Sequence, residues 1–265
     1  MPDYPVKERY TIEDLRQIVA ILRGKDGCPW DREQTHQSIR RDFIEETYEA
    51  VEAIDLGDAD LLREELGDVL LQVVFHARLE EEEGRFALED VVSDICKKLI
   101  VRHPHVFGDV TVSSLGELLQ NWEAIKNEKK GVASYTETLE LVPKVYPGLM
   151  RAQKVAKRAA KAGFCFGSLE AAFADVRAEL AELSEAVGRG DKPQAKEELG
   201  DLLFACANLA RHLGEDAEEA LSFSCEKFIA RFRAVEAMAR EAGQDMAALS
   251  DEERAALWGK AKENS

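Results

Sequence analysis

The sequence predicts an all-α protein built from two related helical modules. Long stretches rich in Ala, Leu, Glu, Lys and Arg place apolar residues three and four positions apart, which is the spacing of amphipathic helices. Alternating patterns of β-branched residues, which would indicate strands, are nearly absent. A repeat, revealed by a shift of 133 residues, then divides the predicted helices into two copies.

The helical pattern is clearest in two neighbouring stretches, Phe43 to Leu56 and Leu61 to Leu79. Gly57 and Asp58 lie between them and predict a turn, because glycine ends helices and aspartate begins them. Glycine or proline predicts further helix ends at Gly24 to Pro29, Gly84, Pro104, Gly131, Pro143 to Gly148, Gly163, Gly190-Asp191 and Gly214.

The repeat places acidic residues on acidic residues. Under the shift, the run Glu64-Glu65-Leu66-Gly67-Asp68 falls on Glu197-Glu198-Leu199-Gly200-Asp201, and Glu46 and Glu49 fall on Glu179 and Glu182. Further along, the offset drifts with loop length, but Lys98 and Arg102 match Lys227 and Arg231, and Trp122 and Lys126 match Trp258 and Lys262. Proline and glycine interrupt the helical pattern near the middle of the chain. We therefore expect an N-terminal module at residues 1–135 and a C-terminal module at residues 136–265.

Composition excludes several classes of protein. The 265 residues carry a formal net charge of -17, which argues against binding of a nucleic acid polymer, since phosphate backbones are held by clustered Lys and Arg. The five cysteines form no CxxC pair, which suits a reducing cytosol and gives no zinc motif. No apolar run is long enough for a membrane span, and the first residues lack a signal-peptide profile. We expect a soluble cytoplasmic protein with no membrane partner.

The repeated carboxylates predict a metal site in at least one module. Residues three apart share a helix face, so Glu46 and Glu49 can point at one spot, as can Glu65 and Asp68 on the next helix. The second copy repeats this with Glu179, Glu182, Glu198 and Asp201. Converging carboxylates repel one another, and a hard divalent cation relieves the repulsion, which favours Mg²⁺ with Mn²⁺ as a substitute.

The acidic residues have two other interpretations. The first is an ordinary solvated acidic face, which is common in a chain with 52 acidic residues. The second is a diiron site, which requires Glu-x-x-His motifs, whereas those positions here end in Asp68 and Asp201. An iron site is therefore not favoured.

Basic and aromatic residues follow each acidic group. The pairs Lys98–Arg102 and Lys227–Arg231 stand four apart and can hold phosphate oxygens, although salt bridging to nearby acids is the simpler alternative. Trp122 and Trp258 can offer a ring to a base, or lie in the core.

These residues resemble a known family. Glu45-Glu46-Thr47-Tyr48-Glu49, followed by Glu65-Leu66-Gly67-Asp68, is similar to the EExxE and ExxD signature of MazG proteins. Further similar segments are Gly27 to Asp31, Glu83 to Phe86, Arg102 to Phe107, Leu149 to Lys154 and Asn208 to Arg211. One departure is Ala178, which stands where the second copy would have the first Glu of EExxE.

The resemblance implies a fold and an activity. The fold would be tandem MazG-type helical modules with four-helix-bundle-like cores, completed by dimerisation into a homodimer. The activity would be hydrolysis of nucleoside triphosphates between the α and β phosphates, which suits clearance of non-standard nucleotides and equally control of signalling nucleotides. The implied metal ligands are Glu179, Glu182, Glu198 and Asp201, with Glu46, Glu49, Glu65 and Asp68 as first-module counterparts. The implied nucleotide contacts are Lys227, Arg231, Trp258 and Lys262, with Lys98, Arg102, Trp122 and Lys126 as counterparts.

Our mechanistic hypothesis is metal-assisted attack of water on phosphorus, with Glu182 or Glu49 as the catalytic carboxylate to test. We favour the second module slightly. Two alternatives remain open from the residues alone: a non-catalytic nucleotide-binding or protein-interaction module, and an enzyme selective for one base, such as one acting on dUTP or dCTP.

Overall fold

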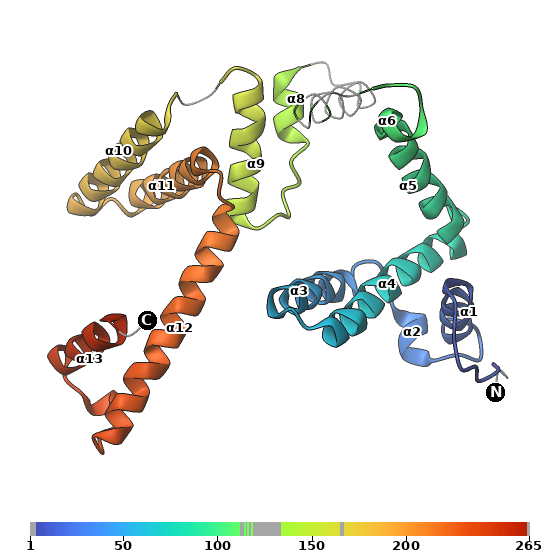
Figure 1. The fold of residues 1–265 in the computed structure, drawn as a ribbon, viewed down its shortest axis with the longest axis horizontal. Helices are drawn as coiled ribbons and strands as arrows, with labels where there is room; N and C mark the ends of the chain where they lie inside the picture. Colours follow the sequence, from blue (N-terminus) through green and yellow to red (C-terminus); the bar gives the residue numbers. More distant parts are fainter. Residues whose placement is uncertain are drawn as a thin grey trace. The chain divides into compact units, whose positions relative to one another are not determined.

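The computed structural model describes residues 4–111, 114, 116, 118, 134–164 and 167–263. Every regular element in these ranges is a helix, which confirms the all-α prediction (Figure 1). The chain divides into two compact units, Met1–Lys129 and Lys130–Ser265. Three residues discussed above, Trp122, Lys126 and Gly131, lie outside the described residues.

The first unit is built around a helical hairpin. Its helices are α1 (Ile12–Leu22), α2 (Pro29–Glu33), α3 (Arg40–Leu56), α4 (Ala59–Glu82), α5 (Leu88–Arg102) and α6 (Pro104–Phe107). Helices α3 and α4 lie side by side, and α1 packs against α4 (Figure 1). The buried core of this unit consists of Val19, Ile39, Val74, Phe75, Ala77, Leu79 and Leu88. Most of these residues lie on α4, so this core packs α4 against α1.

The hairpin turn follows from two residues. Gly57 ends α3 with φ +66°, a left-handed conformation that glycine adopts without a Cβ clash. Asp58 then begins α4, because its carboxylate accepts hydrogen bonds from the backbone N–H of Asp60 and Leu61. Gly190 with φ +72° and Asp191, which accepts from the N–H of Gln194, make the same turn in the second unit.

The second unit repeats the hairpin. Its elements are α8 (Tyr135–Glu140), α9 (Gly148–Lys161), α10 (Leu169–Gly188), α11 (Lys192–Leu213), α12 (Ala217–Glu241), the 3₁₀ turn η1 (Met246–Ala248) and α13 (Asp251–Glu263). Helices α10 and α11 lie side by side, α9 packs on α11, and α13 packs on α12 (Figure 1).

Small residues lie where the hairpin helices touch. Ala53 of α3 and Ala186 of α10 occupy equivalent positions in the repeat, and both are 0% exposed. A methyl side chain lets the paired helices approach closely, which brings the polar side chains of the two helices into each other's reach.

Large apolar side chains stay exposed on several helices of the chain. On α3 these include Phe43, Ile44, Tyr48 and Val51, and on α12 they include Phe223, Phe228, Ile229 and Phe232. Such faces are typical of surfaces that another element or chain covers. Among the described helices, none combines the length and the apolar character that crossing a bilayer requires.

Candidate metal centres

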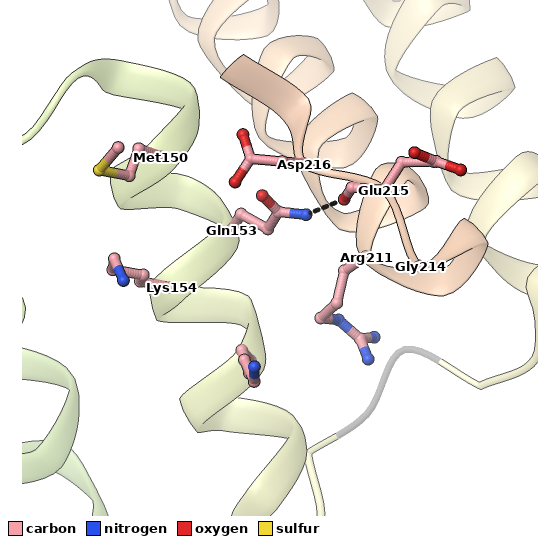
Figure 2. Close-up of a pocket in the computed structure, with 8 residues that line it drawn as sticks. Met150, Gln153, Lys154, Arg211, Gly214, Glu215 and Asp216 are labelled. Carbon is pink, nitrogen blue, oxygen red and sulfur yellow. Dashed lines mark hydrogen bonds between the residues drawn. The ribbon is translucent and has the colours of Figure 1, made fainter. Parts of the chain in front are cut away.

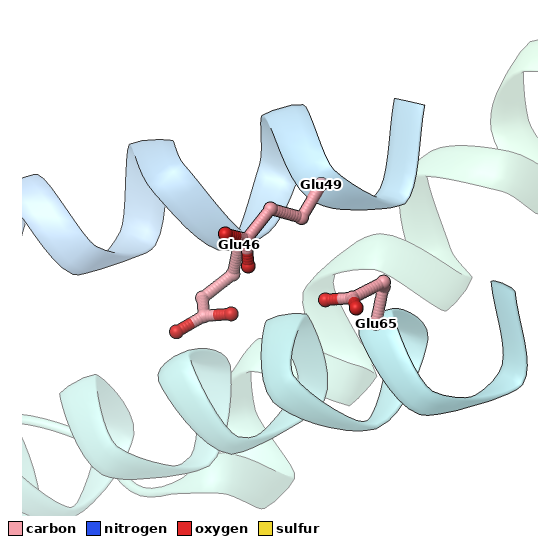
Figure 3. A group of neighbouring side chains, drawn as sticks. All are labelled: Glu46, Glu49 and Glu65. Atoms are coloured by element: carbon pink, nitrogen blue, oxygen red, sulfur yellow. The ribbon is translucent and has the colours of Figure 1, made fainter. Parts of the chain in front are cut away.

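The first hairpin brings three carboxylates together. Glu46 and Glu49 project from α3, and Glu65 projects from α4 into the same space (Figure 3). One carboxylate oxygen of each residue lies within 4.8 Å of those of the other two. Glu46 and Glu65 are half-buried, whereas Glu49 is exposed. Three oxygen ligands at this spacing can hold a hard divalent cation and leave its other positions for water and phosphate.

The second hairpin forms the equivalent group. Glu179 and Glu182 of α10 meet Glu198 of α11, again with one oxygen of each within 4.8 Å of the others. Glu182 is exposed like Glu49, but Glu198 is buried at 8% exposure. The two groups therefore share their geometry and differ in how deeply the ligand from the second helix is buried.

The electrostatics of both groups favour a cation. Burial raises the pKa of Glu46, and the charges of Asp68 and Glu49 raise it further. Burial and the charge of Glu49 likewise raise the pKa of Glu65. In the second group, burial and then the charge of Glu182 raise the pKa of Glu179. A bound cation would relieve this repulsion, so the residues present fit a divalent metal ion.

The predicted fourth ligand of each module stands slightly apart. Asp68 and Asp201 do not belong to the groups in which all oxygens lie within 4.8 Å. Their charges still raise the pKa values of Glu46 and Glu179, respectively, so each lies within electrostatic reach of its group. The structure thus places three of four predicted carboxylates together and the fourth beside them.

A chain of two hydrogen bonds holds Glu198, the buried carboxylate of the second group. Gln194 donates from Nε2 to Oε1 of Glu198 over 3.3 Å, and Arg189 donates from Nη2 to Oε1 of Gln194 over 3.0 Å. Sequence reasoning missed both residues. The repeat contains a signal for them. Arg189 and Gln194 are polar where the first copy has Leu56 and Leu61, which cannot make these hydrogen bonds.

The predicted nucleotide contacts lie on other helices. Lys98 and Arg102 are on α5, Lys227 and Arg231 on α12, and Trp258 and Lys262 on α13. The Trp258 ring packs on Phe228, with centroids 4.9 Å apart, so it joins α13 to α12. Lys227 places its Nζ 5.5 Å from the centroid of the Phe223 ring. Their counterparts Trp122 and Lys126 lie outside the described residues.

Comparison with known proteins decides the family. The model of the MazG nucleotide pyrophosphohydrolase domain matches this chain twice, at residues 34–107 and 168–236. The chain belongs to the MazG family. The first match includes the carboxylates of α3 and α4, and the second includes those of α10 and α11, so each candidate centre lies in one MazG domain. Trp258 and Lys262 lie beyond the second match.

Relatives match the MazG chain over nearly its whole length. A protein of Thermotoga maritima named nucleoside triphosphate pyrophosphohydrolase/pyrophosphatase MazG is 43% identical over 94% of this chain and 95% of its own. The nucleoside triphosphate pyrophosphohydrolase of Escherichia coli K12 is 44% identical over 95% of this chain and 97% of its own. The uncharacterized protein YabN of Bacillus subtilis is 44% identical over 98% of this chain, which matches 54% of YabN.

Proposed function

We propose that this MazG protein hydrolyses nucleoside triphosphates between the α and β phosphates, releasing a nucleoside monophosphate and pyrophosphate. The observation that carries the proposal is the pair of three-carboxylate groups, one in each MazG domain. The names of the relatives from Thermotoga maritima and Escherichia coli support the same reaction. We propose residues 1–135 and 136–265 as the two functional modules.

The carboxylates would hold Mg²⁺, with Mn²⁺ as a substitute. The proposed ligands are Glu46, Glu49, Glu65 and Asp68 in the first module and Glu179, Glu182, Glu198 and Asp201 in the second. When bound, the ion neutralises phosphate oxygens and makes the phosphorus more electrophilic. The difference in exposure supports a further division of roles, because Glu49 and Glu182 are exposed, whereas the other carboxylates of each group are half-buried or buried.

Glu49 and Glu182 are the proposed catalytic residues. Each is the exposed carboxylate of its group, so each meets water while its neighbours hold their places between the helices. Either can accept a proton from a water molecule that attacks the phosphorus atom.

Cations and a tryptophan are proposed to bind the rest of the nucleotide. In the second module these are Lys227, Arg231, Trp258 and Lys262, and in the first module Lys98, Arg102, Trp122 and Lys126. Lysine and arginine can neutralise the departing pyrophosphate, and an aromatic ring can stack on a base. Trp258 packs against Phe228 with the two rings tilted by 48°, and it is only half-buried, which leaves part of its ring surface for such a contact.

We also propose a cytoplasmic homodimer. The apolar side chains exposed on α3 and α12 are more than a third accessible, which is costly in water over so many positions. A second copy presents the same faces and can cover them symmetrically. Light scattering on the purified protein should give twice the monomer mass, and a monomer at all concentrations would contradict this part of the proposal. The four described cysteines are unpaired, which suits a reducing compartment.

The test of the activity is product analysis. The purified protein is incubated with each common ribo- and deoxyribonucleoside triphosphate, with Mg²⁺ or with a chelator, and products are separated by anion exchange. Monophosphate and pyrophosphate that vanish on chelation support the proposal and rank the bases. Diphosphate and orthophosphate would contradict the cleaved bond, and nucleotide binding without turnover would favour a non-catalytic binding module.

A further inference from the structure

We infer that a cavity between α9 and the turn from α11 to α12 is a second anion site, which binds a small molecule with linked phosphates. The cavity has a volume of about 470 Å³. Lys154 and Lys157 of α9 and Arg211 of α11 line it, together with the turn residues that begin at Gly214 (Figure 2). It differs from the metal centre of the same module, because Arg211 and Glu198 are separated by roughly 20 Å along α11 at 1.5 Å per residue.

The charge of α9 sets it apart from the rest of the chain. The helix GLMRAQKVAKRAAK carries five basic residues and no acidic residue. The whole chain, by contrast, has 52 acidic and 35 basic residues. Lys154 and Lys157 stand three apart and therefore project from neighbouring positions on one face of the helix. A concentrated positive field on an acidic protein indicates a specific anionic ligand rather than a general surface charge.

Among the described residues, the three cations of the cavity form no ion pair with a carboxylate, although Glu215 and Asp216 also line the cavity. Arg16, Arg23, Arg78 and Arg85 all form ion pairs with glutamates. Across the described part of the chain, neither lysine of the cavity nor Arg211 has a carboxylate within 4.0 Å. Arrays of unpaired cations repel one another, and a phosphorylated anion would remove that repulsion.

The two acidic residues that line the cavity do not point their carboxylates at its lysines: one caps a helix, and the other is directed away from α9. Asp216 caps α12, because its Oδ1 accepts from the N–H groups of Glu218 and Glu219. The carboxylate of Glu215 is directed away from α9 (Figure 2). Neither carboxylate forms an ion pair with Lys154 or Lys157 among the described residues.

The walls of the cavity are held in place by hydrogen bonds. Gln153 donates from Nε2 to the carbonyl of Glu215 over 2.5 Å and accepts from the N–H of Ala217 over 3.2 Å, which ties α9 to the turn (Figure 2). Arg211 donates from Nε to Oδ1 of Asn208 over 3.0 Å, and Asn208 is 1% exposed. Nη2 of Arg211 also lies 2.7 Å from Nε2 of His212, so two side chains hold the guanidinium and Nη1 is left for an anion. A group held in place in this way binds phosphate oxygens at a lower entropic cost.

The ligand class follows from size and charge. Three cations match the several negative charges of two or three linked phosphates better than those of one phosphate. Two sources share this chemistry: free pyrophosphate and the triphosphate of a nucleotide. The inference rests on the cavity itself and stands whether or not the carboxylate groups catalyse the proposed hydrolysis.

Calorimetric titration of the 265-residue protein in excess chelator tests the inference. Without a divalent cation the carboxylate groups repel anions, so any binding reports a cationic site. We expect saturable binding of inorganic pyrophosphate that weakens with salt. Lys157→Gln and Arg211→Gln should each weaken it at least about tenfold, since each removes a charge-assisted hydrogen bond. Lys25→Gln, which removes the same charge from the first unit, should leave it unchanged.

Two further measurements distinguish pyrophosphate from a nucleotide triphosphate as the ligand and control for misfolding of the variants. If adenosine triphosphate in chelator competes with pyrophosphate, the site takes the triphosphate of a nucleotide as well; if it does not, the site is for pyrophosphate. The conservative Lys157→Arg variant should retain binding. No saturable binding of either anion, or equal binding by Lys157→Gln, Arg211→Gln and wild type, would overturn the inference. Turnover with Mg²⁺, measured separately, reports on the proposed function alone.

Discussion

Gln194 donates a hydrogen bond to Glu198 over 3.3 Å and so fixes the most buried carboxylate of the two candidate centres. Arg189 in turn holds Gln194 over 3.0 Å. The first module has Leu56 and Leu61 at these positions, so Glu65 lacks the equivalent support. The repeat has therefore kept the carboxylates while changing the side chains that orient one of them, and the two centres should differ in affinity for a cation.

Replacing Gln194 by the leucine of the first module should weaken cation binding. Gln194→Leu removes the donor that orients Glu198, and we expect roughly tenfold weaker Mn²⁺ binding at one site, the usual effect of a hydrogen bond to a charged group. Calorimetry on metal-free protein measures this directly. Gln244→Leu, in an exposed loop, is the matched control. Unchanged Mn²⁺ binding by Gln194→Leu would show that the bond does not position the ligand.

The stability of the metal-free protein should depend on pH through the carboxylate groups. The pKa values of Glu46, Glu65 and Glu179 are raised above the ordinary 4.5, so the folded state favours their protonated forms. Their contribution to the free energy of unfolding is present at low pH and is lost as pH rises through the raised pKa values. Mg²⁺ binds the deprotonated groups and should restore stability.

The measurement is the midpoint of thermal unfolding with Mg²⁺ and with chelator. We expect the stabilisation by Mg²⁺ to be larger at about pH 7.5 than at about pH 5, because protons compete with the ion at low pH. The double variant Glu46→Gln/Glu179→Gln should lose most of the difference. An equal effect of Mg²⁺ at both pH values would contradict the assignment of these residues as ligands.

A histidine pair in the first unit predicts a second pH dependence of opposite sign. Nδ1 of His36 lies 2.7 Å from Nδ1 of His76, and the rings stack with centroids 5.0 Å apart. Burial and the neighbouring His36 lower the pKa of His76 from its ordinary 6.5. The folded state thus favours neutral His76, and stability is lost as pH falls from 6.5 toward the lowered value.

The free energy of unfolding, measured against pH in saturating Mg²⁺, isolates the contribution of His76, because the carboxylate groups are then occupied by the ion. We expect His76→Phe, which keeps a ring against Phe43, to flatten the decline in the free energy of unfolding below about pH 6.5. His105→Phe, which replaces a histidine outside the pair, should leave this decline unchanged. A decline as steep in His76→Phe as in wild type would show that another group controls the dependence.

The close approach of the hairpin helices predicts intolerance to larger side chains. Ala53→Leu and Ala186→Leu each add bulk at a fully buried contact and should lower the free energy of unfolding by about 1–3 kcal/mol. Chemical denaturation gives the value. Ala59→Leu, at an exposed position of α4, should change stability little. Normal stability in both core variants would mean that the helices are less closely packed than the structure indicates.

Residues with local signals were predictable from the sequence. Gly57 and Asp58 specify the hairpin turn through backbone conformation and capping, and the three-residue spacing of Glu46 and Glu49 puts both on one helix face. The His36–His76 contact joins residues 40 apart in the chain, and no periodic pattern reports such a pair. Side-chain geometry between helices also decides that Asp68 stands beside its group rather than within it.

The most direct test of the central claim is the rate of monophosphate release by the double variant Glu49→Gln/Glu182→Gln. With general acid–base catalysis worth about 10²–10⁴-fold, we expect its turnover with Mg²⁺ to fall at least about 10²-fold while its circular dichroism is unchanged. The single variants identify the working module, and Glu140→Gln on α8 should retain full activity. Full activity in the double variant would contradict the claim that the carboxylate groups of α3–α4 and α10–α11 are the catalytic centres.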